Sequence, residues 1–97
     1  MNFEDFQLSL EQSAPPKGLS EPLLVLWYDG RGDWNQSHEV AQANEIPANN
    51  LIHAYLHRKE GDQSNAGYWY RRAGRALPKG SLAQEWEALV REFLGNS

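Results

Sequence analysis

Apolar residues recur along much of the chain at spacings of three and four, which is the pattern of amphipathic helices. The clearest case follows residue 81, where one helical face would carry Leu82, Trp86, Leu89, Val90, Phe93 and Leu94. No stretch alternates between apolar and polar residues for long enough to indicate a β-strand. We therefore predict an all-α protein.

Capping residues and helix breakers divide this pattern into five helices. The capping residues, each just before a helical run, are Ser20, Asp33, Asp62 and Ser81. The breakers are Gly30, Gly32, Gly61, Pro78 and Gly80. We predict helices over residues 21–29, 34–43, 49–60 and 63–76 and from 82 onward, with residues 44–48 as a connection.

The first 19 residues show no sustained period. They contain the run Ala14-Pro15-Pro16-Lys17-Gly18, in which two prolines favour extended backbone and the glycine adds freedom. We predict a partly ordered N-terminal arm over residues 1–19 and a single helical domain over residues 20–97. The apolar residues available to dock this arm are Phe3, Phe6, Leu8 and Leu10.

The dipeptide Gly-Asp occurs at residues 32–33 and again at 61–62, 29 residues later, each time between two predicted helices. Two helical hairpins of this kind cannot bury their apolar faces alone, and stacking them solves that problem. We expect two stacked αα-hairpins, with the amphipathic C-terminal helix as a cap.

This arrangement resembles the tetratricopeptide repeat, well over residues 47–80 and loosely over 19–49. With Ala66 on the alanine of that family's second helix, Tyr70, Ala73 and Pro78 fall on its aromatic, alanine and proline positions, and Ala54 falls on its small first-helix residue. The spacing is shorter than the family's usual length of about 34 residues. Asn50 and His57 also stand where aromatic residues are usual. The resemblance implies helical hairpins that recognise a protein or peptide.

The segment HAYLHRKEGD-x2-NA-x-YWYRRAG is also similar to a group of small bacterial and fungal proteins of unassigned function. That resemblance spans about residues 26–75. It implies a shared fold and supplies no reaction.

Composition excludes several classes of function. The chain has no cysteine, which excludes disulfides, thiol catalysis and cysteine-ligated zinc. No apolar run approaches the roughly 20 residues that span a bilayer, and the acidic N-terminus lacks the features of a secretory signal. We expect a cytoplasmic protein without a membrane partner.

The run Tyr68-Trp69-Tyr70-Arg71-Arg72 combines aromatic and basic residues, as nucleic-acid-binding surfaces do. The net charge of −4 and the lack of a long basic stripe count against that function. We expect no nucleic-acid partner. A homo-oligomer through an aromatic patch that includes Tyr68, Trp69 and Trp86 is the alternative use of these residues.

Our leading hypothesis is a protein- or peptide-binding module. The candidate groove residues lie on the first helix of each hairpin and are Asp29, Tyr55, Arg58 and Lys59. Arg58 and Lys59 would hold an acidic group or a carboxyl terminus of the partner.

The alternative is a small histidine-based enzyme or metal protein. His53 and His57 are four residues apart, so they share one helical face, and Glu60 lies near them. His38, from the first hairpin, would complete the candidate polar site if the hairpins stack closely, with Asp33 and Asp62 as orienting partners. On the sequence alone we assign no metal and no cofactor, because H-x3-H lacks the glutamate of the HExxH motif.

Overall fold

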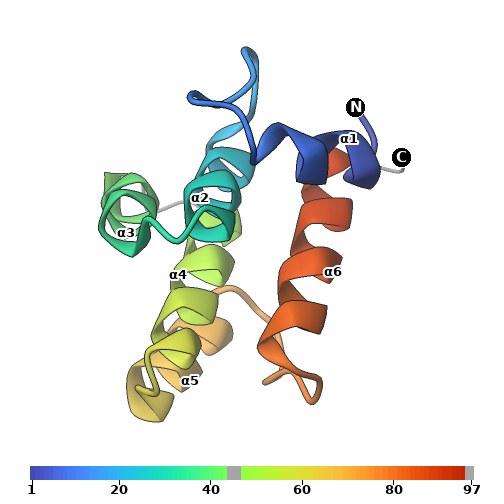
Figure 1. Cartoon of the computed structure of the whole chain (residues 1–97). Helices are drawn as coiled ribbons and strands as arrows, with labels where there is room; N and C mark the ends of the chain where they lie inside the picture. Colours follow the sequence, from blue (N-terminus) through green and yellow to red (C-terminus); the bar gives the residue numbers. More distant parts are fainter. Residues whose placement is uncertain (44–46, 96–97) are drawn as a thin grey trace.

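The computed structural model describes residues 1–43 and 47–95, and their side chains except those of residues 42–43 and 47–49. The helices are α1 (Phe3–Ser9), α2 (Glu21–Gly30), α3 (Trp34–Ala43), α4 (Pro47–Lys59), α5 (Gln63–Arg72) and α6 (Leu82–Leu94) (Figure 1). No described residue belongs to a strand, so the all-α prediction is confirmed. None of the described helices is long and apolar enough to cross a membrane.

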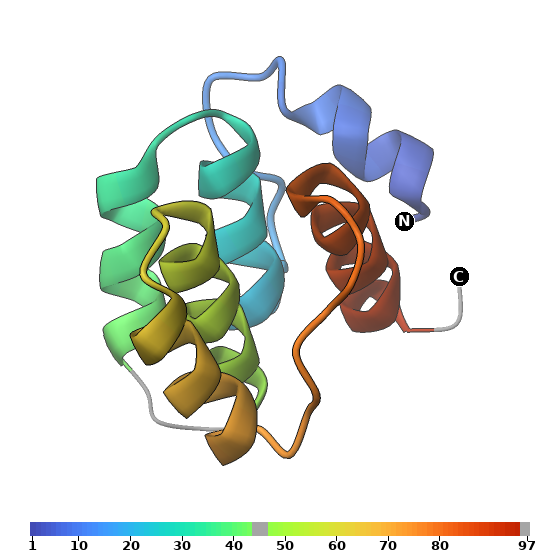
Figure 2. The same cartoon turned by 90° about the horizontal axis from the view of Figure 1, so that it is seen from below.

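Helices adjacent in the chain pack side by side as α2 with α3 and as α4 with α5. Helix α4 also contacts both α2 and α3, so it lies at the centre of this four-helix group (Figure 1). Helix α6 packs against α2 and α4, and α1 packs against α6, which places α1 and α6 together beside the group (Figure 2).

The turn between α2 and α3 and the turn between α4 and α5 are both formed by a Gly-Asp pair, which ends one helix and begins the next. Gly32 and Gly61 have φ angles of 83° and 86°, a left-handed conformation that glycine adopts without steric cost. The next amide, of Asp33 or Asp62, donates to a carbonyl five residues earlier and so closes the preceding helix. The same aspartate accepts a hydrogen bond from the backbone N–H three residues later and so starts the next helix.

Several helix boundaries differ from those predicted. Helix α2 includes Gly30, because the glycine that closes it is Gly32. Helix α4 begins at Pro47 instead of residue 49, which proline tolerates because the first helical N–H has no partner within the helix. Helix α5 ends at Arg72 instead of residue 76, because Gly74 adopts a left-handed φ of 74°. Residues 44–46 of the predicted connection lie outside the described residues.

The N-terminal arm is more structured than predicted. It contains α1, whose first turn is capped by the Asn2 side chain, 2.8 Å from the Asp5 backbone nitrogen. Phe3 and Phe6 are buried, with ring centroids 5.8 and 6.0 Å from that of Trp86. The apolar residues Phe3 and Phe6 dock the arm as expected, whereas Leu8 is 65% exposed and does not.

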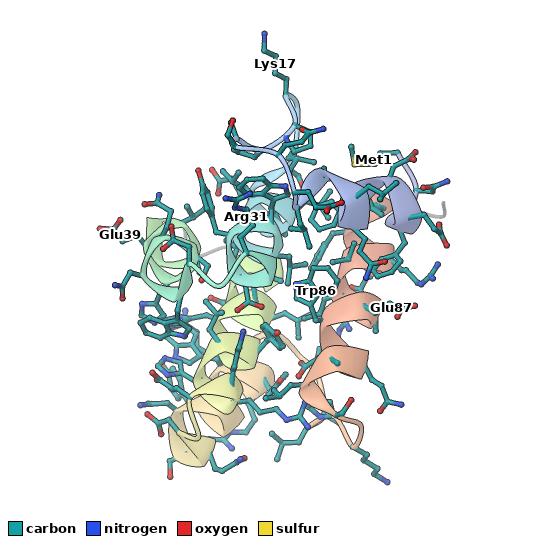
Figure 3. The ribbon with its side chains drawn as sticks, viewed as in Figure 1. Met1, Lys17, Arg31, Glu39, Trp86 and Glu87 are labelled. Carbon is teal, nitrogen blue, oxygen red and sulfur yellow. The ribbon has the colours of Figure 1, made fainter. Side chains whose placement is uncertain are left out.

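Two indole N–H groups form hydrogen bonds that link α2 to α1 and to α6. Trp27 Nε1 donates to the buried Ser9 hydroxyl at 3.1 Å. Trp86 Nε1 donates to the Leu26 carbonyl at 3.1 Å, and Figure 3 shows Trp86 between α2 and α6. The buried Trp27 and the half-buried Trp86 therefore each carry a satisfied polar group across one of these interfaces.

Candidate metal centre

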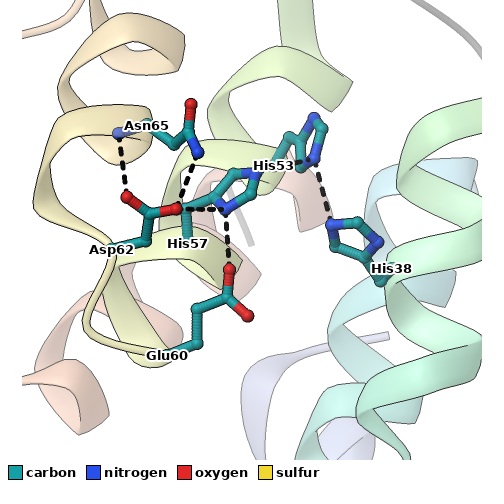
Figure 4. Close-up of polar contacts among 6 residues, drawn as sticks. All are labelled: His38, His53, His57, Glu60, Asp62 and Asn65. Atoms are coloured by element: carbon teal, nitrogen blue, oxygen red, sulfur yellow. Dashed lines mark hydrogen bonds and ion pairs between the residues drawn. The ribbon is translucent and has the colours of Figure 1, made fainter.

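The three histidines of the chain converge at the interface between α3 and α4 (Figure 4). His53 Nε2 lies 3.1 Å from His38 Nε2 and 3.1 Å from His57 Nε2. Two of these residues share a face of α4, and the third comes from α3, so the first and second hairpins both contribute. Their three nitrogens could hold one metal ion.

Hydrogen bonds cannot make both of these 3.1 Å contacts favourable at once. A neutral imidazole nitrogen carries either one hydrogen or one lone pair. If His53 Nε2 carries the hydrogen, it donates well to only one of its two neighbours. If it carries the lone pair, it accepts well from only one. One of the two 3.1 Å contacts therefore lacks a proper hydrogen bond unless another species lies among the nitrogens.

Acidic and amide side chains position the outer nitrogen of His57. His57 Nδ1 lies 2.8 Å from Glu60 Oε1 and 3.9 Å from Asp62 Oδ2 (Figure 4). The Asn65 amide donates to the same Asp62 oxygen at 2.6 Å. A hydrogen on Nδ1 that faces Glu60 leaves the Nε2 lone pair of neutral His57 directed at the other two histidines. Carboxylates orient metal-binding histidines in this way.

Aromatic rings fix the orientation of the other two imidazoles. Trp34 stacks on His38, one turn later on α3, with ring centroids 4.6 Å apart and an interplanar angle of 15°. Trp69 of α5 lies against His53 at 4.3 Å. The guanidinium carbon of Arg72 lies 5.1 Å from the centroid of the Trp69 ring. The histidine cluster is thus held between two indoles.

The surroundings favour neutral imidazoles. Burial lowers the pKa of His53 to about 4, and repulsion from His57 and His38 adds to the effect. Burial also lowers the pKa of His38, with a further contribution from His57. Both rings are consequently unprotonated at neutral pH, which is the form that binds a metal.

The candidate groove residues lie in a different place, where α2, α4 and α6 meet. Asp29 is buried and accepts from the Tyr55 hydroxyl at 2.8 Å and from Lys59 Nζ at 2.8 Å. Asp29, Tyr55 and Lys59 also line a hollow of about 500 Å³ whose other walls come from α1 and α6. The structure therefore brings three of the four groove residues together.

Arg58, the fourth groove residue, faces α6. It donates to Glu85 at 2.7 Å and to the Gly80 carbonyl. Glu85 also accepts from the Tyr70 hydroxyl at 2.5 Å, so this buried carboxylate has two partners. The positive charge expected to hold a partner is neutralised within the chain.

The expected aromatic patch is divided between two elements. Tyr68 and Trp69 lie on α5, with Tyr68 45% exposed. Trp86 lies on α6 and packs against Phe3 and Phe6.

The sequence predicted the members of the histidine cluster but not the tryptophans that pack against it. His38, His53, His57 and Glu60 come together, and Asp62 joins them as an orienting partner, whereas Asp33 caps α3. Trp34 and Trp69 were not expected beside the histidines. The spacing of four between Trp34 and His38 was a usable signal, because residues four apart on a helix are neighbours.

Compared with models of known protein families, with curated proteins and with solved structures, the chain matches none.

Proposed function

We propose that this protein binds a divalent first-row transition metal, with Zn²⁺ as the reference ion, through Nε2 of His38, His53 and His57. The observation that carries the proposal is the convergence of three imidazole nitrogens whose two 3.1 Å contacts cannot both be good hydrogen bonds. A metal ion accepts all three lone pairs simultaneously.

The nitrogen spacing fits such an ion. Zinc–nitrogen bonds of about 2.0–2.1 Å in a tetrahedral site place neighbouring nitrogens about 3.3 Å apart. The contacts of His53 with its two neighbours are 3.1 Å each, so small ring movements suffice. The imidazole donors favour zinc, copper, iron or nickel over magnesium or calcium, which prefer oxygen ligands.

Three histidines leave the fourth tetrahedral position for a ligand from outside the cluster. Catalytic zinc sites have this composition, with water or substrate in the open position, whereas structural sites are closed by four protein ligands. Such a centre supplies a Lewis acid and lowers the pKa of bound water. The His57 side chain is 13% exposed, so the cluster lies near the surface of the protein.

Metal content of the purified chain tests the proposal. The protein is stripped with a chelator, dialysed against Zn²⁺ and analysed for zinc. We expect one ion per chain, and its loss in His53→Gln and in His38→Gln. Glu39→Gln, an exposed neighbour of His38, is the matched control and should retain the ion. Zinc that the chain does not retain, or retains equally well in both histidine variants, would refute the proposal.

A thermal scan supplies an independent measurement. A metal at about 100 times its Kd adds about 2.7 kcal/mol to the free energy of unfolding. For a domain of this size that gain raises Tm by roughly 10 °C or more. His53→Gln should remove the rise without removing the fold.

We retain a tetratricopeptide-like module for protein or peptide recognition as the second candidate function. The pairing of α2 with α3 and of α4 with α5 through Gly-Asp turns supports it, as does the hollow beside Lys59. An acidic peptide would displace Lys59 from Asp29. A captured partner whose affinity is unaffected by Arg58→Ala and Lys59→Ala would contradict this use of the groove.

A further inference from the structure

One buried polar atom beside the histidine cluster lacks a partner. Within the part of the chain whose side chains are described, Trp34 Nε1 is a shielded side-chain nitrogen without a hydrogen-bond acceptor. The other two tryptophans that bridge elements, Trp27 and Trp86, both donate their indole N–H. A buried donor without an acceptor is unfavourable and calls for an explanation, such as a ligand that accepts its hydrogen bond.

The position of Trp34 connects this donor with the proposed metal. Its ring is stacked on His38, 4.6 Å from the imidazole centroid and nearly parallel to it. A metal-bound oxygen lies about 2.0–2.2 Å from the ion, and an N–H···O hydrogen bond spans about 2.9 Å. An anion with two oxygens can therefore offer one oxygen to a metal ion and the other to a nearby N–H donor.

Local charge favours an anion over a neutral ligand. Three neutral imidazoles bring no negative charge to a divalent cation. The carboxylates of Glu60 and Asp62 lie at the outer nitrogen of His57, on the side of that ring away from the three Nε2 atoms. The Arg72 guanidinium, over the Trp69 ring that packs on His53, adds positive charge on that side.

We infer that the open metal position takes a small oxyanion, a carboxylate or a phosphate, one oxygen of which binds the metal while another accepts from Trp34 Nε1. The inference rests on the proposed metal function and names the class of ligand or substrate that this site binds. It also gives the Trp34 indole a role in ligand recognition beyond stacking.

The test uses the full chain loaded with Co²⁺, whose visible absorption reports on its ligands. Inorganic phosphate and acetate are titrated separately. We expect each to change the spectrum saturably. Trp34→Phe keeps an aromatic ring on His38 and removes the N–H, so it should weaken the binding of the better anion about ten- to a hundredfold, as loss of a hydrogen bond to a charged group does. Its Co²⁺ affinity should change little.

Trp86→Phe is the matched control, because it removes an indole N–H that donates to the Leu26 carbonyl, away from the histidines, and should leave anion affinity nearly unchanged. The indole resonance of Trp34 in the wild-type protein gives a second measurement that needs no variant. It should move downfield when phosphate or acetate is added to the metal-loaded protein.

The outcomes separate the two proposals. If the chain does not bind Co²⁺, the metal function fails and the oxyanion inference fails with it. If Co²⁺ binds but neither anion changes its spectrum or the Trp34 indole resonance, the oxyanion inference alone is overturned. Equal anion affinities of Trp34→Phe and the wild type would overturn the role of the indole.

Discussion

His38 Nε2 and His53 Nε2 lie 3.1 Å apart, although α3 carries one residue and α4 the other. The contact joins the two hairpins across the interface between α3 and α4. A metal ion held by both residues would link the hairpins as well as offer a site for chemistry. Binding at this site and stability of the fold should therefore change together.

Glu60→Gln should weaken metal binding. The carboxylate 2.8 Å from His57 Nδ1 fixes the hydrogen on that nitrogen and frees the Nε2 lone pair. Loss of such an orienting partner typically costs about 10- to 100-fold in metal affinity. Competition titration with a zinc chelator measures the change. An affinity equal to that of the wild type would show that His57 is oriented without Glu60.

Gly30→Ala should destabilise the fold. A Cβ at residue 30 would lie 2.9 Å from Trp86 Cζ2 and 3.0 Å from Leu10 Cδ1, where α2 meets the layer formed by α1 and α6. Overpacking of this kind costs about 1–3 kcal/mol, which chemical denaturation resolves.

Gly67→Ala is the matched control for that substitution. Its Cβ would meet only the flexible end of Arg71, at 3.4 Å. Because alanine is favoured over glycine inside a helix by about 1 kcal/mol, this variant should be slightly more stable than the wild type. Equal effects of the two alanines would contradict the packing described for Gly30.

Alkaline pH should unfold the protein through its buried tyrosines. Burial raises the pKa values of Tyr55 and Tyr70, with further contributions from Asp29 and Glu85 respectively. Both phenols stay neutral in the fold, whereas in the unfolded chain they ionise near pH 10. Their contribution to stability is therefore complete below pH 10 and is lost as the pH rises above it.

Tyr70→Phe separates that effect from other alkaline titrations. The variant should be less stable at neutral pH, because Glu85 loses the hydroxyl donor at 2.5 Å and hydrogen bonds to charged groups contribute about 1.5–3 kcal/mol. Above pH 10 it should lose stability less steeply than the wild type, by about 1.4 kcal/mol per pH unit for the missing phenol. Denaturation at a series of pH values measures both. If the free energy of unfolding fell equally steeply with pH in Tyr70→Phe and the wild type, Tyr70 would not contribute to the alkaline loss of stability.

Local signals predicted most of the helices. The Gly-Asp turns and the Ser81–Gln84 capping box act within a few residues, so their outcome is readable from the chain. Helix α1 was missed because its stability depends on Phe3 and Phe6 reaching Trp86, a contact between distant segments. Short helices are marginal without such packing.

The candidate site was also predictable only where it depends on local sequence. The spacing of His53 and His57 places them on one face of α4, and this was predictable from helical geometry. Whether His38 reaches them depends on how closely α3 packs against α4, which no local pattern reports. The positions of Trp34 and Trp69 beside the cluster depend on the same packing.

X-ray absorption at the zinc edge of the zinc-loaded protein tests the central claim most directly. We predict a four-coordinate ion with three imidazole nitrogens at about 2.0–2.1 Å and one further light ligand. His53→Gln should lose this signature. A spectrum with one imidazole or none, or with a fully hydrated ion, would contradict a metal centre at His38, His53 and His57.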